Sequence, residues 1–248
     1  MEIKEEADGS LTIEDHRDVG NFILELTHSH PLDSDLRDPD EAGLTSFRGE
    51  IFYSPDSERT IMKPAGFING YVVLVDHGYP MDIMDSVDQE LWNYFEALFD
   101  PKSGWLKEGF ETYGDLLVLN RMDIAPRCRG FGLGLATMYE TIKRMGNGCA
   151  ACAIHVCPIQ FQNNSGMPEA QHFRTGGVEK WNEVMQIDKF STKDQRTETD
   201  KLMRYYAKLG FEPYENGVVN NLMTMDLALR QPKFKDLAKD GEVLVLSM

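Results

Sequence analysis

The sequence predicts an α/β fold of the α+β kind, in which helices flank a mixed, mostly antiparallel central sheet. Strand-like runs in residues 47–53 and 66–76, separated by the turn-rich "SPDSER", are typical of antiparallel strands. An apolar run, a glycine-rich turn, a helical pattern and a second apolar run then follow one another between residues 115 and 157, which is the order of a parallel crossover. A chain of 248 residues can bury a sizeable core, so we expect one domain with additions.

The N-terminal third of the chain predicts a segment with a loop, followed by sheet and helix. "VGNFILELTH", residues 19–28, allows a short helix, and the acidic, proline-broken residues 30–43 predict a loop, so residues 1–46 are assigned to an N-terminal segment. Residues 86–100 predict an amphipathic helix that starts with a capping box and carries apolar side chains at helical spacing. The capping box is Ser86 with Gln89, and the apolar positions are Val87, Leu91, Tyr94, Phe95 and Leu98.

The middle of the chain predicts a strand, a turn, a helix and a further strand. "DLLVLNRMDIA", residues 115–125, is typical of a buried strand, and "GLATMYETIKRMGNG", residues 134–148, is typical of a helix that ends at Gly-Asn-Gly. In such a crossover the helix starts at the edge of the sheet, where its unpaired N–H groups and the positive end of its dipole point outward. The pattern therefore predicts an anion-binding turn.

Composition and charge narrow the function classes. Twenty-five Lys and Arg against forty-one Asp and Glu give a net charge of −16, which argues against nucleic-acid binding, because that needs a basic face, and favours a cationic partner. No run is long and apolar enough to span a membrane, and the polar, acidic start lacks the pattern of a secretion signal, so we expect a cytoplasmic protein that does not bind membranes.

The cysteines raise the question of a metal site. Three of the four cysteines cluster with a histidine in "CAACAIHVC". On a strand, side chains alternate, so Cys149, His155 and Cys157 would share one face and Cys152 the other, and one strand cannot close a tetrahedron. We therefore expect reduced cysteines and no metal site.

The spacing of the glycine turn separates it from two common phosphate-binding motifs. The dinucleotide fingerprint needs a third glycine three residues after Gly132, but Leu135 stands there. No Gly-Lys-Ser/Thr follows as in a P-loop. Ile124-Ala125-Pro126 followed by Arg129-x-x-Gly132-x-Gly134 resembles the acetyl-coenzyme A loop of the GNAT superfamily of N-acetyltransferases. The resemblance implies that backbone groups of the strand end bind the pantetheine arm and that the turn and two arginines bind the pyrophosphate. These residues are Met122 and Ile124, then Arg127, Arg129, Gly130, Phe131, Gly132, Leu133, Gly134 and Leu135.

A second motif strengthens this resemblance. Tyr206-Ala207-Lys208-Leu209-Gly210-Phe211 resembles the family's helix that carries a tyrosine four residues before Gly-Phe. By resemblance Tyr206 protonates the coenzyme thiolate, and Tyr205 is the competing assignment. The resemblance covers residues 47–229, with an insertion at residues 158–199 whose Phe161, Phe173 and Trp181 could pack over the acceptor cleft or form a surface cluster of their own. Residues 230–248 include the strand-like "GEVLVLSM", which could add to a sheet edge, its own or that of a second copy in a homodimer.

The expected reaction is transfer of an acetyl group from acetyl-coenzyme A to a primary amine of a small molecule or peptide. Such a transfer needs a neutral amine, so a base is required, and Asp123 and His155 are both candidates. Asp123 could instead pair with Arg121 or Arg127, and His155 could be a core residue. Two other function classes remain: an acyl-coenzyme A binder without catalysis, and a scaffold in which the glycines only allow close packing. The chain departs from the family pattern at Thr199, where an asparagine is usual.

Overall fold

The computed structural model describes residues 2–5, 11–15, 18–29, 43–54, 63–75, 89–107, 110, 114–130, 132–161, 183, 185–186, 194–215 and 219–227. The strands are β1 (Glu2–Glu5), β2 (Leu11–Asp15), β3 (Asp18–Ser29), β4 (Leu44–Ser54), β5 (Lys63–Val73), β6 (Asp115–Ile124), β7 (Cys149–His155), β8 (Glu212–Pro213) and β9 (Leu222–Asp226). The helices are α2 (Gln89–Leu98), α3 (Leu133–Met145) and α6 (Gln195–Ala207), with 3-10 turns η4 (Pro126–Cys128) and η5 (Ile159–Phe161).

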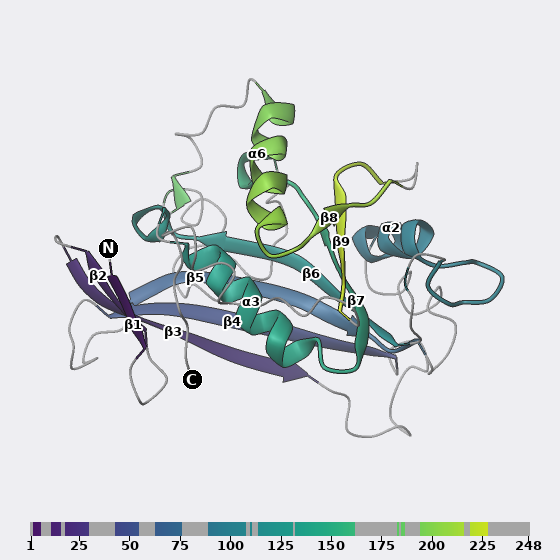
Figure 1. Ribbon diagram of the computed structural model, residues 1–248, viewed down its shortest axis with the longest axis horizontal. Helices are drawn as coiled ribbons and strands as arrows, with labels where there is room; N and C mark the ends of the chain where they lie inside the picture. The colour runs from purple at the N-terminus through teal and green to yellow at the C-terminus, as the bar shows by residue number, and fades with distance from the viewer. Residues whose placement is uncertain are drawn as a thin grey trace.

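The strands form one sheet in the order β1-β2-β3-β4-β5-β6-β7-β9-β8. Among the described strands β6 and β7 pair in parallel, through the crossover helix α3, and the other neighbours pair antiparallel. In Figure 1 β3 and β4 lie nearly horizontal while β9 stands upright, so the sheet is strongly twisted. The expected mixed, mostly antiparallel sheet flanked by helices is confirmed.

The short helix expected at residues 19–28 is wrong, because this segment is the long strand β3. Its apolar side chains follow a period of two: Phe22 is buried and Leu24 and Leu26 pack against the core, whereas Glu25 and Thr27 are exposed. β3 pairs with β4 from Asn21–Ser54 to Ser29–Ser46, so pairing to a neighbouring strand decides its conformation. β3 is therefore a strand of the central sheet, and β4 itself starts at Leu44.

The helices cover both faces of the sheet. α3 and the C-terminal turn of α6 pack on one face over Ile68, Leu117 and Cys152, and α2 packs on the other face over Val73 and Val118. Figure 1 shows α3 in front of the sheet, with α6 standing beside it. The site described below lies where the first of these helices meets the sheet.

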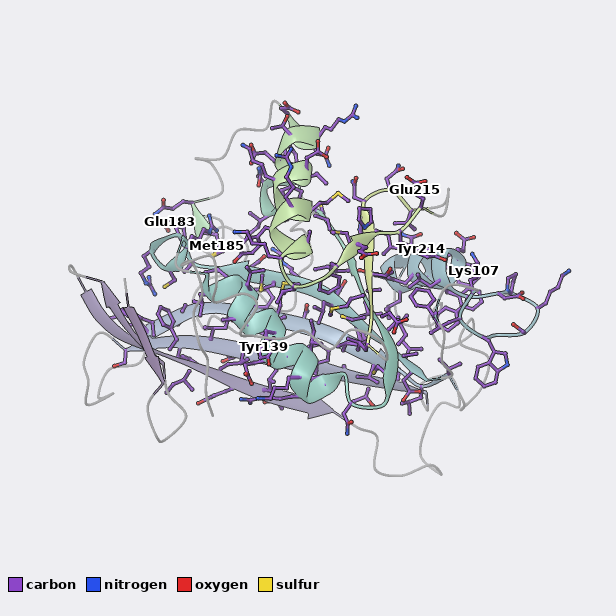
Figure 2. The ribbon with its side chains drawn as sticks, viewed as in Figure 1. Lys107, Tyr139, Glu183, Met185, Tyr214 and Glu215 are labelled. Atoms are coloured by element: carbon purple, nitrogen blue, oxygen red, sulfur yellow. The ribbon has the colours of Figure 1, made fainter. Side chains whose placement is uncertain are left out.

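Lys107, from the loop that follows α2, caps the C-terminal end of this helix. The last turn of α2 contains no basic residue. Lys107 instead donates from Nζ to the carbonyls of Glu96 at 2.7 Å and Ala97 at 2.9 Å, and its N–H donates to the Leu98 carbonyl at 2.8 Å. Figure 2 shows Lys107 next to α2. A cation on the unpaired carbonyls at the negative end of the helix dipole stabilises α2 in its place on the sheet.

The cysteines on β7 do not alternate as expected. Asp115 pairs with Cys149 but Leu116 pairs with Ala151, so Ala150 is an extra residue in the ladder. Cys149 and Cys152 consequently both pack in the core under α3. All four cysteines are free thiols, and burial, helped by the carboxylate of Asp115, raises the pKa of Cys149 to about 12.

Several expectations fall on parts of the chain outside the described residues. These are the Ser86 end of the capping box, the acidic loop at residues 30–42, Phe173 and Trp181 of the insertion, and the tail at residues 230–248. The last part of the assigned insertion is helical, since α6 begins at Gln195 with Asp194 as its N-cap. The strand expected after the second motif is confirmed as β9.

Candidate functional site

A gap opens in the sheet where β6 and β7 separate. The parallel ladder between them ends at the pair Leu119–Ile154, whereas β6 continues along β5 as far as the pair Gly66–Ile124. A bulge lies at the point of separation: Asn69 pairs with Arg121 and Gly70 with Leu119, so Asn120 is an extra residue. The separation leaves one edge of residues 120–124 facing the gap.

Tyr94 of α2 occupies the β7 side of this gap. His155 pairs with Leu222 of β9, and the next N–H, that of Val156, donates to the Asn221 carbonyl. Because successive N–H groups on a strand point to opposite sides, the His155 N–H points toward β6. It donates to the Tyr94 hydroxyl at 2.6 Å instead of to a carbonyl of β6. The sequence predicted Tyr94 only as an apolar helix position, and periodicity carries no signal for this second role.

A cavity of about 540 Å³ fills the gap. Its walls come from the ends of β6 and β7, the η4 turn, the first turn of α3, and α6. Most of the residues predicted from the two motifs, and both candidate bases, line it. They are Met122, Asp123, Ile124, Arg129, Gly130, Gly132, Leu133, Gly134, Leu135, His155 and Tyr206. Segments more than 70 residues apart in sequence thus meet around one cavity.

One predicted residue is placed differently, and another is not described. Arg127 is not in the lining; its guanidinium donates to the Pro64 carbonyl at the start of β5. Arg127 thereby fixes the turn to the sheet rather than adding charge to the cavity. Phe131 lies outside the described residues.

The glycine turn has the backbone that its sequence requires. Gly130 has φ +85° and Gly132, the N-cap of α3, has φ +74°, both in the left-handed region that favours glycine. The first helical bond of α3 runs from the Ala136 N–H to the Gly132 carbonyl, so the preceding N–H groups have no partner within the helix. At Gly134 a Cβ would approach Met122 Cε and the Tyr205 hydroxyl to 3.0 Å each, so its absence allows β6 and α6 to approach the helix.

The adjacent tyrosines of α6 occupy different parts of the cavity. The Tyr205 hydroxyl accepts a hydrogen bond from the Leu135 N–H at 3.1 Å, at the start of α3. Tyr206 is 5% exposed and lines the cavity. Burial, followed by the neighbouring Tyr205 and the carboxylate of Asp123, raises the pKa of Tyr206 above its ordinary value, which keeps its hydroxyl protonated at neutral pH.

A buried ion pair lies beside Tyr206. Arg121 donates to Asp123 Oδ2 from Nε at 2.8 Å and from Nη2 at 2.7 Å, and both side chains are almost fully buried. Of the two pairings that the sequence left open for Asp123, the structure has the one with Arg121. His155 lines the same cavity from the end of β7, so both candidate bases are brought together with Tyr206.

The lining is more cationic than the chain. Among the described lining residues there are four cations, Arg121, Arg129, Lys201 and Lys208, and two carboxylates, those of Asp123 and Glu198. Arg129 donates from Nε to the Ile124 carbonyl at 2.7 Å, and burial lowers its pKa from the ordinary value while Asp123 opposes this shift. Lys201 pairs with Glu198 at 2.7 Å. Lys201 and Lys208 were not predicted. An anionic ligand therefore meets a locally favourable field, although the whole chain carries a charge of −16.

The chain was also compared with known proteins. No family model, curated protein or solved structure matches it. Within the described ranges, no helix is both long and apolar enough to cross a membrane, and no group of three or more His, Cys, Asp and Glu side chains is arranged to hold a metal ion.

Proposed function

We propose that the protein transfers an acetyl group from acetyl-coenzyme A to a primary amine. The observation that carries the proposal is the cavity between β6 and β7, where the glycine turn at the start of α3 and the tyrosine of the second motif meet. The strand order, with one parallel pair at the site of the crossover, also agrees with the GNAT-like fold that the two motifs imply.

The lining offers a complementary group for each part of the coenzyme. The N–H groups of Leu133 and Gly134 at the start of α3, with Arg129, suit the pyrophosphate because they combine donors that the helix does not use, the helix dipole and a fixed charge, whereas the Leu135 N–H donates to Tyr205. The edge of β6 that β7 leaves unpaired at Met122 and Ile124 suits the amides of the pantetheine arm, which would pair with it as an additional strand does, although the Ile124 carbonyl already accepts from Arg129. The thioester would then reach the neighbourhood of Tyr206.

The reaction follows from these positions. The neutral amine attacks the thioester carbonyl carbon, a C–N bond forms, and the C–S bond breaks. The departing thiolate takes a proton from the Tyr206 hydroxyl, which is protonated at neutral pH. The proton lost by the amine passes to His155 or Asp123, directly or through water, and Tyr206 is reprotonated from solvent before the next cycle.

Titration calorimetry with acetyl-coenzyme A, followed by thiol release with a panel of primary amines, tests the proposal. We expect saturable binding, and we expect Gly132→Val to abolish it because valine is strained at φ +74°. Unchanged affinity in Gly132→Val would refute the binding of the pyrophosphate by the glycine turn. Absence of binding in the native protein would favour a packing role for the glycines. Binding without turnover on any amine would identify an acyl-coenzyme A binder without catalysis.

A further inference from the structure

A second hollow, of about 350 Å³, lies on the sheet next to the bulge of β6. Its lining comes from β3, β4 and β5 and is mostly polar: Thr27, Ser46, Phe47, Arg48, Asn69, Gly70 and Tyr71. The hollow is separate from the cavity between β6 and β7, and none of its lining residues belongs to the motifs described above. Among the described residues that line it, Arg48 is the one with a formal charge.

The guanidinium of Arg48 is held in place on one side and lacks a partner on another. Nε lies 3.3 Å from Glu50 Oε1, and the guanidinium carbon lies 5.1 Å from the ring centroid of Phe67, a cation–π contact. Nη2 is buried and makes no hydrogen bond. A buried N–H donor of a charged group costs free energy unless a ligand or water satisfies it, so this atom indicates a binding position.

The surroundings select the class of ligand. A planar guanidinium with a free edge matches a carboxylate, which accepts two parallel hydrogen bonds. Hydroxyl and amide groups of Thr27, Ser46 and Asn69 lie in the same hollow. Glu50 beside Arg48 would repel a doubly charged phosphate more strongly than a singly charged carboxylate.

One row of residues paired across β4, β5 and β6 connects the hollow to the main cavity. Arg48 pairs with Asn69, and Asn69 pairs with Arg121, so the three side chains share a face. Arg121, which lines the main cavity, lies with its guanidinium carbon 5.9 Å from the same Phe67 ring. The two guanidinium carbons are therefore separated by no more than the sum of their distances to that ring.

We propose that Arg48 binds the carboxylate of the acceptor, so that the acceptor carries both a primary amine and a carboxylate several bonds apart. This inference rests on the proposed function for its amine end. It replaces the cationic acceptor that the net charge of −16 favoured with a zwitterionic one. The carboxylate would lie over β4 and β5, and the amine would point along the row toward the gap at β6.

Binding to the full chain tests the proposal without requiring turnover. The probes are β-alanine, γ-aminobutyrate, δ-aminovalerate, ε-aminocaproate and L-lysine, each beside its carboxamide, titrated with and without coenzyme A. The readouts are calorimetric affinity and the NMR resonances of labelled arginine side chains. We expect at least one acid to bind about 10-fold or more tightly than its amide, because the guanidinium makes charge-assisted hydrogen bonds only with the carboxylate. A tenfold difference in affinity corresponds to roughly 1.4 kcal/mol. The Arg48 signal should shift with the acid only.

Two variants complete the test. Arg48→Lys should lose most of the preference for the acid, because lysine cannot offer the planar pair of donors. Arg196→Lys, a change at an exposed arginine of α6, should keep it. Equal affinities for all acids and amides, or an unchanged preference in Arg48→Lys, would overturn the carboxylate site. Acetyl-coenzyme A affinity, measured on the same samples, reports separately on the proposed function, so loss of one does not decide the other.

Discussion

Replacement of Tyr94 by phenylalanine tests how the gap in the sheet is kept open. The hydroxyl of Tyr94 accepts the His155 N–H at 2.6 Å, in the position that a β6 carbonyl would occupy in a closed ladder. Tyr94→Phe removes this acceptor while retaining the ring that packs on the sheet under α2. The N–H of His155 would then lack a protein acceptor at the rim of the cavity.

The expected effect is a loss of stability of about 1–3 kcal/mol, the usual cost of leaving a buried polar group unsatisfied. Tyr94 is only 2% exposed, so water cannot easily replace the hydroxyl from the α2 side. For a chain of this length, each kcal/mol lowers the Tm by about 2–4 °C. Protection of the His155 amide against hydrogen exchange should fall as well.

Urea unfolding and amide exchange by NMR measure the two effects. Tyr206→Phe serves as the matched control, since it also removes the hydroxyl of a buried tyrosine, in this case one that lines the cavity. We expect the control to lose less stability than Tyr94→Phe, which removes the acceptor of a backbone N–H. The interpretation of Tyr94 fails if Tyr94→Phe unfolds at the native urea concentration and its His155 amide exchanges at the native rate.

Three further predictions concern catalysis, a helix end and a buried thiol. Tyr206→Phe should lower kcat for any working amine about 100-fold without changing acetyl-coenzyme A affinity. Tyr205→Phe should keep most of its turnover. If thiol release, measured at fixed times, is slow in Tyr205→Phe and normal in Tyr206→Phe, the acid is Tyr205. Lys107→Met should destabilise the fold by about 0.5–1 kcal/mol in urea unfolding because α2 loses the cation on its last carbonyls, whereas Lys102→Met, at an exposed lysine of the same loop, should have no effect. The pKa of Cys149 lies at about 12 in the folded state against 9.0 ordinarily. The contribution of this thiol to stability is therefore complete below about pH 9 and is lost as the pH rises from about 9 to about 12. A pH series in which Cys149→Ala loses stability as steeply as the native protein would contradict this.

The predictable parts of the fold are those in which local pattern and pairing agree. The apolar run of β6, the helical spacing of α3 and its Gly146 end are all local signals, and the structure has them within a few residues of the expected bounds. The segment of β3 was misassigned since Phe22, Leu24 and Leu26 fit a short helix as well as a strand, and only the neighbouring β4 decides between the two.

The candidate site was predictable where the motif itself carries the geometry. Positive φ at Gly130 and Gly132 follows from residue type and spacing, and the crossover places that turn at the edge of the sheet. The roles of Tyr94, Tyr205 and Arg48 depend on contacts across the fold, with His155, Leu135 and Phe67 in turn, for which no local pattern exists. The direction of Arg127 toward Pro64 is likewise a tertiary contact.

The bulge at Asn120 explains why neighbouring residues of β6 serve two different faces of the sheet. In an uninterrupted strand Leu119, Arg121 and Asp123 would share a face, so the ion pair would lie in the apolar core under α3, where Leu119 packs. The extra residue shifts the alternation by one: Arg121 instead pairs with Asn69 and Asp123 with Phe67, on the face that carries Arg48. Met122 then turns toward Gly134 of α3, where its Cε limits the space at that glycine. One residue thus ends the ladder with β7, moves two charges out of the core, and directs the coenzyme side and the acceptor side of the proposed site to opposite faces of the same strand.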